Sequence, residues 1–406
     1  MIFDRLFASG GSKVLTSADL ARALAARSTS AAGVAVTTER AMALSAVFSC
    51  VRVLAESVGQ LPVHLFERIG DDDREKRKAT NHPLYDLLHY SPNKYQTAQE
   101  WREHMMASLA LQGNAYCQII RTGPSTRLRA SELLPINPEA VTPRLDARSG
   151  AVSYRIALEG GESETLPAED VLHIKLFSLG GVVGVNPIRY AREAIGLGIG
   201  AEAFGAKLFA NGAQPGGVIE HPGKLTQAAY ERLKSSWDER HQGVENAHRV
   251  AILEEGTKWQ SVGFPAADSQ LLETRKFQRS EIAGLYGVPL HLIGDLDRAT
   301  FSNIEHQGLS FVTLGLMPHL IRFEQRVAVQ LLTPEERRRY FARFNVNGLL
   351  RGDMTARAAF YRDLINLGVM SPNEARDRED MNPRDGGDVY LTPLNMAVNG
   401  KPPADE

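Results

Sequence analysis

The segment NPIRYAREAIGLGIGAEAFGAKLFANG (residues 186–212) constrains the fold most, because it has a helical pattern with several glycines inside it. The internal glycines are Gly196, Gly198, Gly200 and Gly205. Each destabilises a helix by about 0.5–1 kcal/mol relative to alanine. We therefore expect a long helix that packs very closely against a neighbouring helix.

Composition bounds the class of protein. A chain of 406 residues predicts at least two packed units, and 43% apolar with 23% charged residues is typical of a soluble, folded protein. The sequence predicts neither a membrane span nor a secretion signal. Cys50 and Cys117 lie 67 positions apart, which fits a reducing compartment and favours neither a disulfide framework nor a zinc site. A net charge of −2 argues against binding driven by overall attraction to polyanions.

The first half of the chain alternates helical and strand patterns. Residues 1–40, rich in Ala, Ser, Thr and Gly, predict a poorly packed arm. Residues 41–185 predict an α+β unit. It opens with a helix over 39–58, and a capping box from Thr97 to Glu100 begins a further helix. Its strands are expected in LPVHLFER, NAYCQII, SELLPINP, AVTPRLD, VSYRIAL and DVLHIKL, and GDDDREKRK is expected to be a charged turn or loop.

The second half predicts a small module, then three helical regions. Residues 212–265 combine strands with one helix, and 266–287 form a helix. A third helix over 302–332 is expected to bend near Pro318. After a strand in YFARFNVNGLL, two short helices are expected within 351–380, followed by a loose tail.

The loop sequence YGVPLHLIGDLDRATFSNIEHQ (residues 286–307) gathers polar side chains between two helices. Asp295 and Asp297 are residues that can bind a metal, but nothing in the sequence completes a coordination shell, so turn residues are favoured. His291 is expected to pack or to form a hydrogen bond, and Ser302 to cap the next helix.

No segment of the sequence matches the signature of an enzyme active site. GLGIG lacks the preceding strand and the lysine of a phosphate-binding loop, and no Ser/His/Asp order suggests nucleophilic catalysis. The basic run EERRRY is expected to be a solvated helix end, with a partner or nucleic-acid contact as the less favoured alternative. We expect no catalysis, no cofactor and no metal.

Several short motifs, taken in order, carry a resemblance to a known family. They are LQGNAY, LLPINPEAV, DVLHIK, GVNPI, KLFANGAQPGGVI, NAHRVAILEEG, QLLETRKFQRSEIAGLYGVPLHLIGD, TFSNIEHQGLSFVTLGLMPHLIRFEQ and SPNEARDREDMNP. Over roughly residues 40–390 the chain resembles the portal (head-to-tail connector) proteins of tailed double-stranded DNA phages, in their shorter siphophage and prophage type.

The resemblance implies a ring-forming subunit, with twelve copies at one capsid vertex through which DNA is packaged and ejected. It divides the chain into an N-terminal arm (1–40), wing (41–185), first stem helix (186–211), clip (212–265), second stem helix (266–287), tunnel loop (288–303), wing helix and return strand (304–350), crown (351–380) and tail (381–406). The implied location is the virion vertex, with assembly in the host cytoplasm.

The resemblance also assigns residues to roles. The expected DNA-facing tunnel-loop residues are His291, Asp295, Asp297, Arg298, Thr300, Ser302 and Asn303, and the expected stem-channel residues are Arg275, Lys276 and Arg279. Tyr230 and Trp237 are expected to contact partners at the clip. The implied partners are double-stranded DNA without sequence specificity, terminase, a head-tail adaptor, and the major capsid and scaffolding proteins, with no membrane.

Three alternatives remain open from the sequence. A gene-transfer agent or defective prophage would use the same biochemistry. A metal-dependent hydrolase would require Asp295, Asp297 and His291 to converge. A general oligomeric scaffold would form rings of another symmetry, or none.

Overall fold

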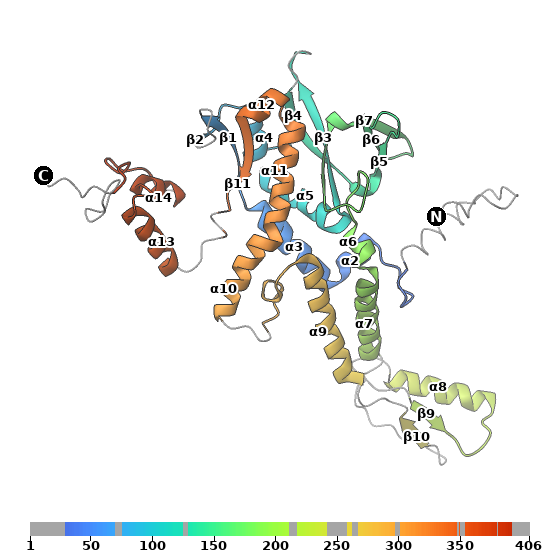
Figure 1. Cartoon of the computed structure of the whole chain (residues 1–406). Coiled ribbons are helices and arrows are strands. Elements are labelled where there is room, and N and C mark those ends of the chain that lie inside the picture. The colour runs from blue at the N-terminus through green and yellow to red at the C-terminus, as the bar shows by residue number, and fades with distance from the viewer. Residues whose placement is uncertain are drawn as a thin grey trace.

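A computed structural model describes residues 29–69, 75–124, 129–210, 217–241, 258–261, 267–296, 301–346, 349, 354–379 and 381–391. Small antiparallel sheets and helices form a body, two helices project from it to a small module, and a pair of short helices lies to one side (Figure 1). The expected α+β class is confirmed. None of the helices in these ranges is long and apolar enough to cross a membrane.

The projecting pair consists of α7 (Arg192–Ala210) and α9 (Ala267–Tyr286), which pack against each other and run in opposite directions (Figure 1). The expectation of one helix over 186–211 is wrong, because α6 (Pro187–Tyr190) ends at Ala191 before α7 begins. The module at the far end contains β9 (Gly217–Glu220), α8 (Gln227–His241) and β10 (Lys258–Ser261), with β9 and β10 antiparallel.

Gly196, Gly198 and Gly200 on α7 face the N-terminal segment. A Cβ atom added to Gly196 would overlap the side chain of Ser30, and one added to Gly198 would lie 3.0 Å from Leu44. Close packing is therefore confirmed, although this neighbour is residues 30–44 and not only a helix. The expected loose arm over 1–40 is wrong for its described part, because Ser30 and Val36 are buried. Residues 1–28 lie outside the described ranges.

The helices of the body begin with α2 (Thr38–Ala43) and α3 (Ser45–Gly59). The expected single helix over 39–58 is interrupted at Leu44, whose backbone is extended. The helices α4 (Pro83–His89) and α5 (Ala98–Gln112) follow, and the capping box between Thr97 and Glu100 is confirmed. The helix α3 packs on both α5 and α9, so it joins the body to the projecting pair.

Two sheets carry most of the expected strands. One has the order β4-β3-β8, from β3 (Asn114–Thr122), β4 (Arg129–Ile136) and β8 (Val171–Lys175). The other has the order β5-β6-β7, from β5 (Val141–Leu145), β6 (Val152–Ala157) and β7 (Ser163–Pro167). The strand β7 was not expected from its sequence, SETLP, of which only Leu166 is buried.

A third sheet has the order β11-β1-β2 and corrects one expectation. It contains β1 (Val63–Ile69), β2 (Glu75–Lys78) and β11 (Tyr340–Phe344), all antiparallel. The segment expected to be a charged turn thus includes β2, all of whose residues are exposed. Pairing with β1 satisfies its backbone and makes it a strand despite its polar sequence.

The last long helix is irregular, as expected. The helix α10 (Phe301–Ser310) continues through a π-helical segment, η5 (Phe311–Leu316), into α11 (Met317–Leu331), so the irregularity lies just before Pro318. The short α12 (Pro334–Arg339) contains the basic run. The expected pair of short helices is confirmed as α13 (Met354–Asn366) and α14 (Pro372–Arg378).

Three of the motifs meet in one buried hydrogen-bond network. The side-chain oxygen of Asn114 accepts from the backbone of Gly184 at 2.7 Å and, at 3.0 Å, from Nε2–H of His173. Burial, then the charges of Arg326 and Lys175, lower the pKa of His173 to about 3, so the ring is neutral at pH 7. Its Nδ1 atom accepts from the hydroxyl of Tyr154 at 3.1 Å. LQGNAY, DVLHIK and GVNPI therefore share a structural role.

Candidate functional site

The residues expected to face a channel lie where α7 and α9 leave the body. Arg275 on α9 has a guanidinium nitrogen 3.7 Å from a carboxylate oxygen of Glu202 on α7. One turn further along α9, Arg279 lies 3.8 Å from the carboxylate of Asp295. Both arginines are therefore balanced by acidic side chains of the same chain, and the stem presents little net positive charge here.

A cavity of about 360 Å³ lies between these ion pairs. Besides them it is lined by Lys276, Gln278 and Leu44, so α9, α7 and the α2–α3 junction all contribute to its walls. Gln278 is 5% exposed, and its Oε1 atom accepts no hydrogen bond within the described part of the chain. Burying an unpaired amide oxygen is unfavourable. The cavity is thus a polar gap in the packing of the stem.

The start of the expected tunnel loop is a defined turn. Gly287 and Gly294 have φ values of +64° and +81°, backbone angles that are disfavoured for residues other than glycine. Between them, η4 (Leu290–Ile293) places the His291 side chain 2.9 Å from the amide oxygen of Gln307 on α10. His291 therefore forms a hydrogen bond between two elements, as the sequence favoured.

The rest of the loop is only partly described. Asp297, Arg298 and Thr300 lie outside the described residues, and of Ser302 and Asn303 only the backbone is described, within α10. The helix begins at Phe301, so Ser302 lies inside it and the expectation that Ser302 caps it is wrong. Helix boundaries depend on local hydrogen bonds that a capping signature locates only to within a residue or two.

The hydrolase alternative finds no support in the described geometry. The His291 ring bonds Gln307, while the Asp295 carboxylate pairs with Arg279. No group of three or more His, Cys, Asp or Glu side chains that could hold a metal occurs within the described ranges, which exclude Asp297. Both cysteines are buried and free.

The module at the far end of α7 and α9 exposes one of its two expected partner contacts. Tyr230 on α8 is half exposed. Trp237 also lies on α8, but its side chain is outside the described part of the structure. An exposed tyrosine can anchor a protein interface because it combines a large apolar surface with a hydroxyl group.

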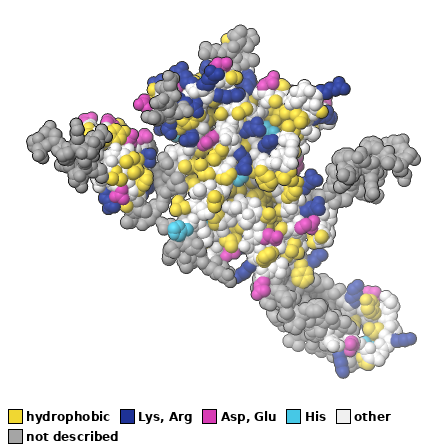
Figure 2. All heavy atoms as spheres, in the orientation of Figure 1, with side chains coloured by type: hydrophobic (Ala, Val, Ile, Leu, Met, Phe, Trp, Pro, Cys, Tyr) yellow, Lys and Arg dark blue, Asp and Glu magenta, His cyan; other side chains and the backbone are white. Residues whose placement is uncertain are grey.

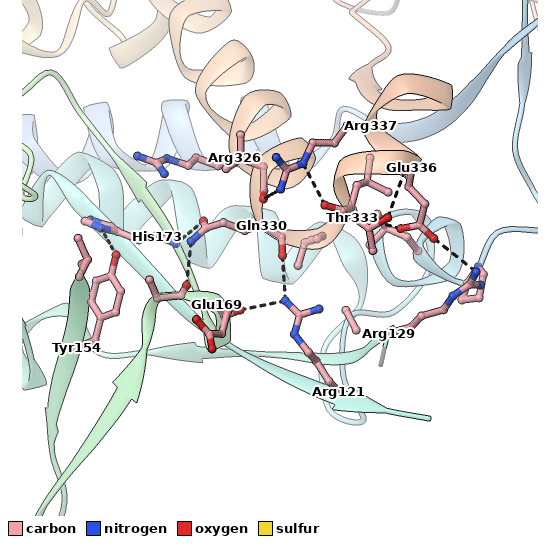
Figure 3. Close-up of a pocket in the computed structure, with 18 of the residues that line it drawn as sticks. Arg121, Arg129, Tyr154, Glu169, His173, Arg326, Gln330, Thr333, Glu336 and Arg337 are labelled. Atoms are coloured by element: carbon pink, nitrogen blue, oxygen red, sulfur yellow. Dashed lines mark hydrogen bonds and ion pairs between the residues drawn. The ribbon is translucent and has the colours of Figure 1, made fainter. Parts of the chain in front are cut away.

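A second cavity, of about 470 Å³, lies in the body between α11–α12 and the β4-β3-β8 sheet (Figure 3). Sequence reasoning missed it, because its walls come from segments far apart in the chain. Arg121 donates to the backbone carbonyls of Glu169 at 2.9 Å and Gln330 at 3.0 Å, and Arg337 donates to Leu332 at 3.1 Å. Both arginines bond to the main chain: Arg121 on β3 holds α11 against the sheet, and Arg337 joins α12 to the end of α11.

Other polar groups of this cavity also serve packing. The side chain of Gln330 donates to the carbonyl of Val171 at 2.5 Å and accepts from the amide of His173 at 3.1 Å, which joins α11 to the edge of β8 (Figure 3). Arg129 lies 3.5 Å from Glu336, the residue that completes the capping box of α12. We assign this cavity a structural role in the body.

Comparisons with known proteins assign the family. The sequence model of the family described as "Phage portal protein" matches residues 45–380. The chain is 33% identical to the portal protein of Enterobacteria phage HK97, over 90% of this chain and 86% of that protein. It is 35% identical to the probable portal protein of Streptomyces phage phiC31, over 92% of this chain and 82% of that protein.

A solved structure shows the same fold. A chain in the neck of a native gene transfer agent particle, computed with C12 symmetry, superposes with a TM-score of 0.58 at 24% identity, over 89% of this chain and 99% of that chain. A match of this extent shows a common fold. The family match and the two phage relatives, each above 30% identity over most of the chain, lead to one conclusion: this chain belongs to the phage portal protein family.

Proposed function

We propose that the protein forms a closed ring at one vertex of a capsid, with α7 and α9 around a channel through which double-stranded DNA enters and leaves. The observation that carries this proposal is the projecting helix pair, which leaves large apolar side chains uncovered. Phe204 on α7 and Phe277 on α9 are 54% and 65% exposed. Such residues on a helix pair outside the body are typical of surfaces buried between copies.

Twelve is the number of copies that we propose. The C12 symmetry used for the gene transfer agent neck supports it, as does membership of the portal family. Head-to-tail contacts between identical subunits close into a ring when the rotation per subunit divides a full turn. We propose the virion vertex as the location, with assembly in the host cytoplasm.

The functional regions are assigned by residue range. We propose that the body over 41–185 is the wing, that α7 and α9 are the stem, that 212–265 is the clip, and that 288–303 is the tunnel loop. The segment 304–350 returns to the wing, and α13 and α14 belong to the crown. In this scheme the balanced pairs Arg275–Glu202 and Arg279–Asp295 suit a surface along which DNA slides. Each unopposed cation would instead add an affinity for phosphate that slows the passage of DNA.

The tunnel loop is the proposed narrowest contact. Its polar residues, from His291 to Asn303, would touch the DNA backbone without reading its sequence and without catalysis. Arg298 is the residue whose charge we expect to matter most, since electrostatic screening is weakest at a constriction from which bulk water is excluded.

The clip is the proposed docking site for terminase during packaging and for the head-tail adaptor afterwards, with the capsid and scaffolding proteins around the wing. Replacing residues 225–250 by a short Gly-Ser linker should leave rings and capsids that assemble but stay empty. The point variants are Tyr230→Ala in the clip and, as the control, Tyr95→Ala at an exposed tyrosine of the wing. DNA filling that is normal without the clip, or abolished only in Tyr95→Ala, would contradict this assignment.

A gene transfer agent portal is the second candidate, because the neck of such a particle has the same fold. The biochemistry would be the same. The length and origin of the DNA inside purified particles distinguish the two, since a phage packages its own genome and a gene transfer agent packages fragments of its host's.

A further inference from the structure

One face of the β11-β1-β2 sheet carries only cationic and aromatic side chains and one histidine. Side chains two residues apart on a strand share a face, and so do directly paired residues on neighbouring strands. The pairs His64–Arg343, Phe66–Phe341, Phe66–Lys78 and Arg68–Lys76 therefore lie on the same side of the sheet. We call this set the basic face: His64, Phe66, Arg68, Lys76, Lys78, Phe341 and Arg343.

Aromatic rings hold the cations of the basic face in place. Phe66 and Phe341 stack with their centroids 5.6 Å apart. The Lys76 ammonium lies 5.0 Å above the Phe66 ring, and Arg68 and Arg343 lie 4.8 Å and 5.6 Å from the Phe341 centroid. Cation–π contacts of this kind fix where a flexible charged side chain points. Lys76 and Arg343 therefore cover the rings and are exposed, whereas Arg68 also donates to the backbone carbonyls of Arg337 at 3.1 Å and Arg338 at 3.2 Å on α12.

Three of the four charged side chains on the basic face carry charge that no ion pair among the described residues balances. Lys76, Lys78 and Arg343 are exposed, and none of them forms an ion pair within the described residues. The two carboxylates of the sheet, Glu67 and Glu75, lie on the opposite face, where Glu67 pairs with Arg77 at 2.8 Å and with Arg339. In a chain with a net charge of −2, this separation of charge creates a local positive field.

Acidic groups near the basic face include two of the described residues, Glu324 on α11 and Asp377 on α14. Burial raises the pKa of Glu324, and the charge of Arg343 on the basic face opposes that rise. Asp377 on α14 raises the pKa of His64, but burial has the larger effect and lowers that pKa to about 4, so His64 is neutral at pH 7. The hairpin segment 70–74, with the sequence GDDDR, is outside the described residues. Lys and Arg side chains gather over the part of the molecule that contains β1, β2 and α12 (Figure 2).

We propose that the basic face binds the phosphate backbone of duplex DNA, without sequence preference, at a site separate from the channel. Cations two residues apart on a strand are roughly 6.6 Å apart, and paired ones on neighbouring strands are closer, so several phosphates can be bound at once. The rings lie beneath the cations and are covered, which disfavours stacking on single-stranded bases. The surface thus favours a polyanion with a repeated charge over a nucleic acid with open bases.

Closed circular DNA distinguishes binding at the basic face from binding in the channel. A covalently closed circular duplex cannot thread through a ring that has already assembled, but it can lie on an outer surface. Purified assembled protein should therefore bind closed circular DNA in a gel shift at low salt, whereas binding through the channel alone requires linear ends. If the protein does not form rings, the same assay on the unassembled chain still tests the basic face.

The test variant is Lys76→Glu/Lys78→Glu/Arg343→Glu, and its matched control is Arg144→Glu/Arg148→Glu/Arg155→Glu, which makes the same charge change at exposed arginines of the β5-β6-β7 sheet. We expect the first to lower the affinity for circular DNA more than tenfold. The salt slope of log K should also fall by about one for each phosphate that the variant no longer binds. The control should bind like wild type.

Three results would overturn the proposal. The first is equal binding of circular DNA by wild type and by the Lys76/Lys78/Arg343 variant. The second is binding of linear DNA only, which leaves the channel as the sole DNA-binding site and the proposed function intact. The third is binding of labelled polyglutamate by wild type but not by the variant, with no binding of circular DNA, which would assign the face to an acidic protein.

Discussion

The carboxylate of Asp295 lies 3.8 Å from the guanidinium of Arg279, so a residue expected to face DNA from the tunnel loop is paired with a residue expected to face DNA from the stem. Asp295 is only 14% exposed, whereas Arg279 is 43% exposed. The pair fixes the start of the loop against α9 and offsets the positive charge of the helix. This ion pair therefore affects how strongly the stem is expected to hold DNA.

Asp295→Asn should therefore strengthen the hold on DNA. The change keeps the shape of the side chain but leaves the charge of Arg279 less balanced, and rings should still form because partly exposed ion pairs contribute about 0.2–1 kcal/mol. Release of DNA from filled particles should become slower and more dependent on salt. Adding Arg279→Gln should return release to the wild-type rate, and unchanged release in both variants would show that this pair does not affect DNA passage.

The protein should lose stability in acid, in part through His173. Because burial lowers the pKa of His173 to about 3, below its usual value, the unfolded chain binds a proton that the folded chain does not. The contribution is fully present above about pH 6.5 and is lost as the pH falls toward 3, at about 1.4 kcal/mol per pH unit.

Urea unfolding between pH 4.5 and 7.5 measures this effect. His173→Gln should be less stable at neutral pH but should show a shallower dependence on pH, by about one proton. The control is His306→Gln, a change at an exposed histidine. An equal pH dependence in wild type and His173→Gln would show that the neutral ring is not the source.

Gly113→Ala should be far more disruptive than Gly150→Ala, although the two glycines have φ values of +71° and +69°. In this left-handed region of backbone conformation, a residue with a Cβ atom destabilises the fold by about 1–2 kcal/mol relative to glycine. A Cβ at Gly113 would in addition overlap the backbone carbonyl of Val185, whereas a Cβ at Gly150 meets nothing within 4 Å. Thermal melting should give a small loss for Gly150→Ala and little folded protein for Gly113→Ala. Similar melting curves would contradict the close approach of these two segments.

Phe277→Asp should block assembly without unfolding the chain. Phe277 is 65% exposed in the single subunit, so a charge there is tolerated until a neighbouring copy buries it. The expected product is a folded monomer by circular dichroism and size-exclusion chromatography. Leu145→Asp, at a 53% exposed residue on β5, is the control that should still assemble. Rings formed by Phe277→Asp would place this residue outside the subunit interface.

Local signals made parts of this fold predictable from the sequence. The helix α5 follows from its capping box, and the turn around Gly287 and Gly294 from its glycines, because these patterns act within a few residues. The strand β2 was missed because EKRK has little strand propensity and becomes a strand through pairing with β1. The break at Ala191 was missed because the helical pattern continues across it.

The site was less predictable, because it depends on contacts between distant segments. Arg275 and Arg279 could be selected by their position on a predicted helix. Their partners lie elsewhere, with Glu202 on another helix and Asp295 beyond a turn. Nothing local indicates that such residues meet, so only the structure shows which carboxylates offset these arginines.

The central claim, a ring with α7 and α9 around its channel, is tested most directly by two-dimensional class averages of the purified, full-length protein. We predict end-on views with twelvefold symmetry and an open centre, and side views in which the narrow part corresponds to the stem and clip. Particles that remain monomers or dimers at every protein concentration, or closed assemblies without a central channel, would contradict the account.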